Sequence, residues 1–259
     1  MIVEVIGCAG AGKTTLARML CERGVTASPV RMLPDLVRDR AILRRVTHPT
    51  AVNVLQELGS FPFFVGGWPS ERDFVAYARR VLARRARSRY DYLNGMRGIV
   101  RKVGMYRLAS SRAQDSIVLS DEGTLLSAYN LFALTTLDLE PRDVETFLRL
   151  VPLPERVVYV TAPVPSLVAR AGLRPTPRRQ HRGRTATEIE SDVRRAVELF
   201  DRIAASPTVA ERLLVVENAD ADESGRRRHV EEIARWLGSP VPRQLSALPL
   251  ELSVPESRA

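Results

Sequence analysis

The segment IGCAGAGKTTL, residues 6–16, constrains this chain more than any other because it joins an apolar run to a helical pattern. Residues 2–6 are mostly apolar and β-branched, as in a strand that is buried on both faces. From Thr14 onward, apolar residues recur at helical spacing. The pattern G-x-x-x-x-G-K-T, from Gly7 to Thr14, therefore falls between a strand and a helix, where it predicts a phosphate-binding loop rather than a chance glycine-rich turn.

Each residue type in this loop suits a polyphosphate ligand. Glycine allows positive φ angles and a close approach of the backbone, so that the N–H groups at the start of the helix point at an anion. Lys13 would then reach the β- and γ-phosphates, and the Thr14 hydroxyl would occupy one coordination position on Mg²⁺. The residues predicted to bind the nucleotide here are Gly7, Gly10, Ala11, Gly12, Lys13, Thr14 and Thr15.

The charged residues support this interpretation of Lys13. The chain has 39 lysine and arginine residues, and only Lys13 and Lys102 among them are lysine. A compact ammonium fits beneath phosphates where a planar guanidinium does not. The net charge of +9 favours anionic partners, namely nucleotides, phosphorylated metabolites, nucleic acid or acidic membrane surfaces, and does not distinguish among them.

Length and cysteine content indicate the class of protein. A chain of 259 residues with 45% hydrophobic residues suits one large α/β domain with insertions. Cys8 and Cys21 have no cysteine or histidine cluster near them, which argues against a disulfide framework or a zinc site and favours a reducing compartment. We find no signal-peptide pattern and no apolar run of about 18 residues. We therefore expect a cytoplasmic protein with no membrane partner.

Strand and helix patterns alternate along the chain. We predict five strands, at residues 2–6, 29–33, 117–120, 156–161 and 213–217. Helical patterns occupy the intervals, at residues 13–23, 35–46, 50–58, 71–88, 91–110, 124–135, 141–149, 164–171, 186–205 and 226–237. Strands separated by helices require crossover connections, so we expect a mostly parallel sheet with both faces covered.

Two segments fall outside this simple alternation. Residues 34–116 are largely helical and separate the second predicted strand from the third, which suits an insertion that covers an acceptor. Residues 239–259 contain four prolines and no helical period, which predicts a loosely attached tail, or one that wraps a neighbouring subunit of a homodimer. The predicted domain therefore spans residues 1–238.

An apolar strand ends in two acids in the sequence SIVLSDEGTL, residues 116–125. Ligands of parallel sheets bind at the carboxyl ends of strands, so Asp121 and Glu122 should reach the site that Lys13 defines. One acid should hold Mg²⁺, and the other should accept or orient the proton of an attacking hydroxyl. We assign Asp121, together with Thr14, to the metal and Glu122 to the base, although the two roles could be exchanged. A helix cap is the alternative for one of them.

Arginines gather in a segment, broken by proline and glycine, that follows the fourth predicted strand. We predict a lid over residues 172–186 whose guanidinium groups close over the transferring phosphate and neutralise its charge. Arg170 and Arg174, one helical turn apart, are the predicted catalytic arginines, and Arg178 is predicted to contact the nucleotide. A solvated basic loop is the alternative in a chain this rich in arginine.

These three features together resemble the P-loop kinases of nucleosides, nucleotides and other small metabolites, with thymidylate-kinase-like proteins as the nearest relatives. The resemblance covers residues 1–237 and implies a three-layer α/β P-loop NTPase fold with a five-stranded, mostly parallel sheet of order 2-3-1-4-5 and a helical insertion. It also implies ATP as the donor, Mg²⁺ as the metal, and an acceptor held by the inserted helices. Thymidylate kinases usually have Arg after the third-strand Asp, whereas here Glu122 follows Asp121. This departure favours a neutral hydroxyl, as in nucleoside, sugar or antibiotic kinases, over a nucleoside monophosphate.

Weaker signals concern the acceptor and the base of the nucleotide. Phe63 and Trp68, in an aromatic-rich segment, could line an acceptor pocket or pack on the core. Arg97 and Arg101 are four residues apart and could hold an anionic acceptor or lie on the surface. Asn218, at the end of the last predicted strand, is expected near the adenine from the fold alone.

The sequence thus favours an ATP- and Mg²⁺-dependent kinase that acts on a hydroxyl or phosphate of a small-molecule acceptor such as a nucleoside, nucleotide, sugar or antibiotic. The alternative is a nucleotide-dependent ATPase or switch, or a polynucleotide kinase, that binds nucleic acid through the arginines of residues 77–90. Few aromatic residues accompany those arginines, so a solvated helix face is favoured over nucleic-acid binding. The sequence does not identify the acceptor, and it offers no clear [NT]-K-x-D stretch that would favour GTP over ATP.

Overall fold

The computed structural model of this chain describes residues 1–23, 26, 28–37, 49–86, 88–113, 116–133, 139–173, 185–219 and 222–238. The predicted tail, residues 239–259, lies outside these ranges. Most of the predicted lid also lies outside them, including Arg174 and Arg178. The part of the chain that the structure describes contains the five expected strands and the elements on either side of the phosphate loop.

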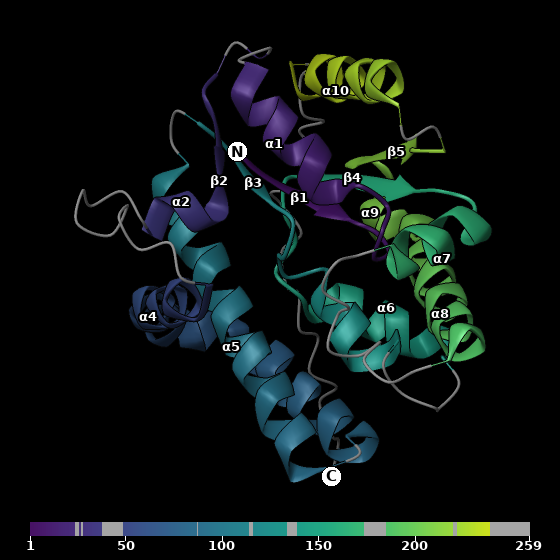
Figure 1. The fold of residues 1–259 in the computed structure, drawn as a ribbon. Coiled ribbons are helices and arrows are strands. Elements are labelled where there is room, and N and C mark those ends of the chain that lie inside the picture. The colour runs from purple at the N-terminus through teal and green to yellow at the C-terminus, as the bar shows by residue number, and fades with distance from the viewer. Residues whose placement is uncertain are drawn as a thin grey trace, which may run out of the picture.

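The strands form one sheet of five parallel strands in the order β2-β3-β1-β4-β5 (Figure 1). This order confirms the prediction of 2-3-1-4-5. All residues of the central strands β1 and β3 are buried, which explains their nearly continuous apolar sequences. The strands are β1 (Ile2–Ile6), β2 (Val30–Met32), β3 (Ile117–Ser120), β4 (Arg156–Thr161) and β5 (Leu213–Glu217).

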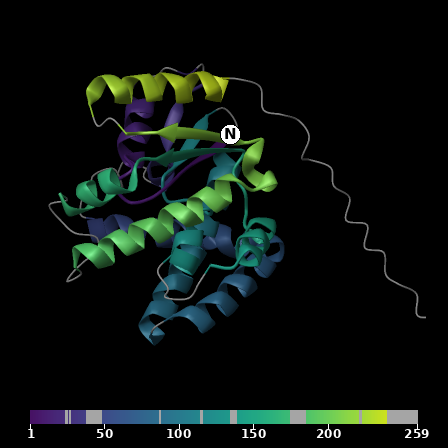
Figure 2. The same cartoon turned by 90° about the vertical axis from the view of Figure 1, so that its right-hand side faces the viewer.

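Helices cover both faces of this sheet, as the crossover connections require. The helices α1 (Lys13–Arg23) and α10 (Glu223–Gly238) pack on one face, and α8 (Ala186–Ala204) lies on the opposite face (Figure 2). This is the three-layer P-loop NTPase fold expected from the sequence. The other helical elements described are α2 (Leu33–Val37), α4 (Pro49–Arg85), α5 (Arg89–Arg112), η1 (Tyr129–Ala133), α6 (Pro141–Leu150), α7 (Val164–Gly172) and α9 (Pro207–Ala210). Among the helices of the described residues, none is both long and apolar enough to cross a bilayer.

The helical insertion differs from its predicted form. The sequence predicts helices at 50–58 and 71–88 joined by an aromatic loop, whereas the structure has one helix, α4, of 37 residues. Pro62 and Pro69 lie inside α4 with exposed side chains, although proline removes a backbone donor and weakens a helix locally. Close packing of α4 on α5 outweighs this local effect, since packing supplies most of the stability of helices in proteins.

The predicted helix at 124–135 is also different. The chain makes a turn and then a short helical segment that ends in the π-helix η1, and residues 134 and 135 lie outside the described ranges. The backbone N–H groups of Leu125 and Leu126 bond to a side chain of β1, which favours a turn there. A long-range contact therefore replaces the first turn that the sequence pattern predicts.

Gly104→Ala should destabilise the pair of helices α4 and α5, because the added Cβ would collide with the carbonyl of Ser60. We expect a loss of about 1–3 kcal/mol in the free energy of unfolding, measured by urea denaturation with circular dichroism. Gly98→Ala, also on α5, is the matched control, since its Cβ would meet only Asn130, at 3.9 Å. The control should be neutral or stabilising by up to about 1 kcal/mol, and equal effects of the two changes would contradict the close packing.

A buried glutamate on β1 fixes the segment that follows β3. Glu4 is 2% exposed, and its two carboxylate oxygens accept the backbone N–H groups of Leu125 and Leu126 at 3.0 and 2.8 Å. A side chain at Gly123 would collide with the same carboxylate. Glu4 therefore sets the path of the chain directly after the two acids that follow β3.

Lys102 of α5 provides the positive charge that accompanies this carboxylate. Burial lowers the pKa of Lys102 to about 8, against the opposing effect of the negative charges on Glu122 and Glu4. Burial likewise raises the pKa of Glu4 to about 7, against the opposing effect of its backbone hydrogen bonds and of Lys102. Each buried group therefore favours the charged form of the other, and together they connect the central strand to the insertion.

Glu4→Ala should lower the free energy of unfolding at neutral pH by about 3–5 kcal/mol, because it leaves two backbone donors without an acceptor and a buried ammonium without its partner. Urea denaturation measures this loss. Glu217→Ala, at an exposed position of β5, is the control and should change stability by no more than about 0.5 kcal/mol. Adding Lys102→Met to Glu4→Ala should recover part of the loss, and a Glu4→Ala protein as stable as the control would contradict this account.

Candidate active site

The loop between β1 and α1 has the backbone conformation that its glycines predict. Gly7, Gly10 and Gly12 have φ angles of +133°, +89° and +94°, and no other described residue has a positive φ. A Cβ on Gly7 would collide with the carbonyl of Val160 on β4. Glycine is therefore required here both for the left-handed backbone and for the close approach of the loop to the sheet.

Lys13 lies against this loop at the start of α1. Its ammonium donates hydrogen bonds to the carbonyls of Gly7 and Cys8, each at 2.8 Å, and the residue is 7% exposed. The next two residues, Thr14 and Thr15, are exposed on the first turn of the helix, and Ala11 within the loop is buried. The positive charge and the N-terminus of α1 therefore face the same place, as a polyphosphate site requires.

The first acid after β3 contacts the start of α1. The Thr14 hydroxyl donates to the Asp121 carboxylate, with Oγ1 and Oδ2 2.7 Å apart. This contact is possible because β1 and β3 are adjacent and parallel, so their carboxyl ends lie at one edge of the sheet. The structure thus brings together the two residues that the sequence assigns to the metal.

The chemistry of this pair fits Mg²⁺. A hydroxyl and a carboxylate are hard oxygen donors, and protein-bound Mg²⁺ typically takes one or two such ligands and completes its octahedron with phosphate oxygens and water. Within the described residues, no group of three or more His, Cys, Asp or Glu side chains could hold a metal ion.

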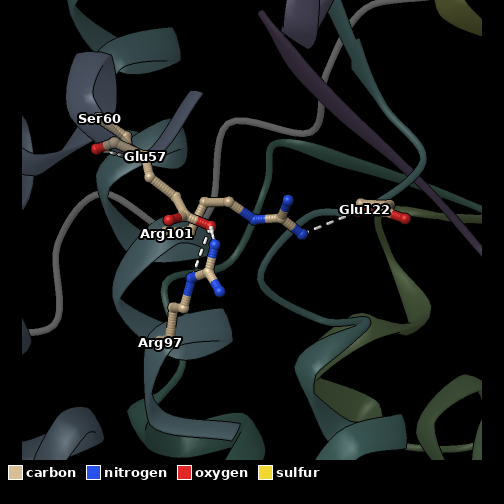
Figure 3. Close-up of polar contacts among 5 residues, drawn as sticks. All are labelled: Glu57, Ser60, Arg97, Arg101 and Glu122. Atoms are coloured by element: carbon tan, nitrogen blue, oxygen red, sulfur yellow. Dashed lines mark hydrogen bonds and ion pairs between the residues drawn. The ribbon is translucent and has the colours of Figure 1, made fainter. Parts of the chain in front are cut away.

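The second acid after β3 is turned toward α5. The Glu122 side chain is 64% exposed, and its Oε2 accepts a hydrogen bond from Nη2 of Arg101 at 3.0 Å (Figure 3). An exposed carboxylate held in one orientation can accept a proton from a bound hydroxyl. Asp121 and Glu122 thus have different partners in the fold.

Arg97, one turn before Arg101 on α5, pairs with a carboxylate of α4. Its Nη2 and Nε lie 2.6 and 2.8 Å from Oε1 of Glu57 (Figure 3). The hydrogen bond and the negative charge of Glu57 raise the pKa of Arg97. Arg97 and Arg101, which the sequence proposes for an anionic acceptor, are therefore each paired with a glutamate. Helix α5 thus carries two ion pairs on this side.

Phe63 and Trp68 lie on different sides of α4, since five residues turn a helix by about 140°. Phe63 packs against the core cluster that contains Leu33 and Leu36, which is the alternative that the sequence left open. Trp68 is 46% exposed, and its ring lies edge to face with Phe64 at a centroid distance of 5.6 Å. The structure therefore does not place these two aromatic residues in a common pocket.

Asn218 follows β5 and borders the phosphate loop. Its Nδ2 donates to the carbonyl of Ala11 at 2.7 Å, and among the described residues its buried Oδ1 has no hydrogen-bond partner. Arg170 of α7 donates to the carbonyls of Asn218 and Ala219 at 3.0 and 2.8 Å. Arg170 thus holds α7 to the segment after β5, and it would have to leave these carbonyls to reach a phosphate.

Sequence reasoning missed three residues that shape the site, Glu4, Lys102 and Glu57. Two of them carry a signal in the sequence, since Glu4 is the one acid in an otherwise apolar strand and Lys102 is one of two lysines. Glu57 carries no comparable signal, because its partner Arg97 is 40 residues away and only the packing of α4 on α5 brings the two together.

No family model matches the sequence, and a search of curated proteins finds no relative. Solved structures do resemble it. A shikimate kinase from Bacteroides thetaiotaomicron has 13% identity and a TM-score of 0.48, over 92% of this chain and 98% of its own. A deoxyadenosine kinase from M. mycoides has 13% identity and a TM-score of 0.47, over 92% and 98%. A protein from Thermus thermophilus has 20% identity and a TM-score of 0.43, over 92% and 97%. The strand order and the glycine loop of this chain identify the P-loop NTPase fold.

Proposed function

We propose that this chain is a kinase that transfers the γ-phosphoryl group of ATP to a hydroxyl of a small-molecule acceptor, with Mg²⁺ as its metal. The hydrogen bond between Thr14 and Asp121, 2.7 Å long, is the observation that carries the proposal. It gathers a hydroxyl, a carboxylate and the ammonium of Lys13 at one edge of the sheet, which is the set expected around the β- and γ-phosphates of a P-loop enzyme. Glu122 supplies a second carboxylate beside them.

The loop and the start of α1 would bind the phosphates of the donor. Backbone N–H groups at the N-terminus of α1 would donate to phosphate oxygens, and Lys13 would exchange its bonds to the loop carbonyls for bonds to the β- and γ-phosphates. Mg²⁺ held by Thr14 and Asp121 would neutralise charge on the transferring group. Catalysis would then come mostly from positioning and from charge neutralisation.

Glu122 would activate the acceptor. Its exposed carboxylate, oriented by Arg101, would accept the hydroxyl proton as the oxygen attacks the γ-phosphorus. The backbone that carries Glu122 is fixed on its far side by the bonds to Glu4, so the carboxylate does not need to be ordered when the acceptor binds. This placement would supply a base at a defined distance from the phosphate loop.

The ion pairs of α5 favour a neutral acceptor over a phosphorylated one. To bind Arg97 or Arg101, a phosphate would have to displace Glu57 or Glu122, and it would then lie beside the carboxylate that it displaced. A hydroxyl-rich acceptor can donate to the same carboxylates and leave both ion pairs in place. Nucleosides, sugars and aminoglycoside-type alcohols are therefore preferred as acceptors over nucleoside monophosphates.

A nucleic-acid-dependent ATPase is the second candidate, because arginines gather near the end of α4. Arg79, Arg80 and Arg84 are exposed and could contact a phosphate backbone. Arg85 is used within the fold, since it pairs with Asp143 at 2.6 Å. This candidate predicts ATP hydrolysis stimulated by nucleic acid and no phosphorylated small molecule.

A screen of nucleosides, nucleoside monophosphates, sugars and aminoglycosides for ADP release tests the proposal. Lys13→Ala should lower turnover about 100-fold or more with an unchanged circular dichroism spectrum, because it removes the charge that stabilises the transferring phosphate. Arg18→Ala, an exposed position on the same helix, is the control and should turn over normally. A wild-type protein that shows no magnesium-dependent ATP binding in calorimetry would contradict the proposal, and ADP release with nucleic acid alone would favour the second candidate.

Glu122→Gln tests whether Glu122 acts as the catalytic base or only forms an ion pair with Arg101. We expect kcat to fall about 10²- to 10⁴-fold with the KM for ATP unchanged, because the amide cannot accept the acceptor proton but can still bond to Arg101. Glu57→Gln is the matched control, since Glu57 also pairs with an arginine of α5, and it should raise the KM for the acceptor with a smaller effect on kcat. Similar kinetic effects of the two changes would show that Glu122 is not the base.

A further inference from the structure

One face of α4 exposes large apolar side chains at regular spacing. Nine large hydrophobic residues are exposed in the part of the chain that the structure describes, and five of them lie on this helix. Their spacing of four, three, four and three residues places them along one stripe, as in the seam of a coiled coil. We call these five residues the α4 stripe; with their exposed fractions they are Val54 (43%), Leu58 (67%), Phe61 (55%), Val65 (54%) and Trp68 (46%).

The surroundings of the stripe are also apolar. Pro62 and Pro69 are exposed beside it, and no charged residue occurs between Glu57 and Glu71, although 27% of the chain is charged.

We propose that the α4 stripe is the interface of a homodimer, in which it packs against the α4 stripe of a second copy of this chain. The spacing suits a helix as the partner, because alternating steps of three and four residues interlock with the same pattern on another helix. This inference concerns assembly and does not depend on the proposed activity.

The stripe is nearly symmetric about Phe61, which suits a two-fold axis. Val54 and Trp68 lie seven residues on either side of it, and Leu58 and Val65 lie three and four residues away. In an antiparallel pair, Val54 of one copy would therefore lie near Trp68 of the other, so that a small side chain meets a large one. Contacts of this kind are self-complementary, as a two-fold interface requires.

Area and charge also favour a second copy over other partners. With about 100 Å² of exposed apolar area for each of the five side chains, two copies would bury about 1,000 Å², which reaches the lower size of a specific interface.

The chain carries a net charge of +9, so two copies repel each other, and this repulsion is weakest where the facing surfaces carry no charge, as along the α4 stripe. A nucleic acid or another strongly acidic partner would need basic side chains that the stripe does not contain.

Sedimentation equilibrium of the full chain tests the proposal. The wild-type protein should have the mass of two chains at micromolar concentration, and Val65→Glu should weaken the association at least about 100-fold because each dimer would bury two carboxylates. Leu58→Glu should have the same effect. Val215→Glu is the matched control, since Val215 of β5 is the same residue type with a similar exposure of 50%, and this variant should remain dimeric. Circular dichroism should show all three variants folded, because the changed side chains lie on the surface.

Three outcomes would overturn the inference. The wild-type chain could be monomeric at every concentration. Val215→Glu could dissociate the dimer as strongly as Val65→Glu, which would indicate a general effect of charge. The wild-type chain could be monomeric and float with phosphatidylcholine vesicles while Val65→Glu does not, which would assign the α4 stripe to a lipid surface.

Discussion

The parallel pairing of β1 with β3 decides which segments meet at one edge of the sheet. It aligns Glu4 with Ser120, so the glycine loop that follows β1 and the acids that follow β3 leave the sheet at the same edge. A register shift of one residue would turn each side chain of β1 to the other face and separate Thr14 from Asp121. The Glu4 carboxylate opposes such a shift, because it belongs to β1 and accepts hydrogen bonds from the backbone that follows β3.

Helix α5 extends this arrangement from the core toward the surface. Along it, Lys102 is 5% exposed, the Arg101 side chain 20% and the Arg97 side chain 57%. Arg97 pairs with Glu57 and Arg101 with Glu122, and the charges of both Glu122 and Glu4 act on Lys102. Exposed ion pairs contribute little to stability, whereas a buried charge without its partner is costly. The inner end of this series therefore determines where α5 sits, and the outer ion pairs add little to its stability.

The sequence predicts the parts of the fold that depend on local patterns. The buried strands, the phosphate loop and the acids after β3 follow from apolar runs, from glycine spacing and from the rule that parallel strands present their carboxyl ends together. The continuity of α4 does not follow, because Pro62 and Pro69 argue locally for a break and only packing on α5 overrides them. The partners of Arg97 and Arg170 were unpredictable for the same reason, since Glu57 and the carbonyls after β5 are 40 or more residues away in the chain.

Part of the basic composition serves hydrogen bonds that hold the described residues together. Several guanidinium groups donate to backbone carbonyls of distant segments, among them Arg112 to Leu36, Arg202 to Leu139 and Arg212 to Pro154. A planar group with five donors suits such positions, because it can satisfy a carbonyl at the end of an element and still reach solvent. The two lysines are both buried instead, Lys13 against the phosphate loop and Lys102 under the influence of the buried Glu4. A high net charge can therefore arise from arginines that form structural hydrogen bonds throughout the fold. The positions of the arginines, rather than their number, indicate whether a surface could bind nucleic acid.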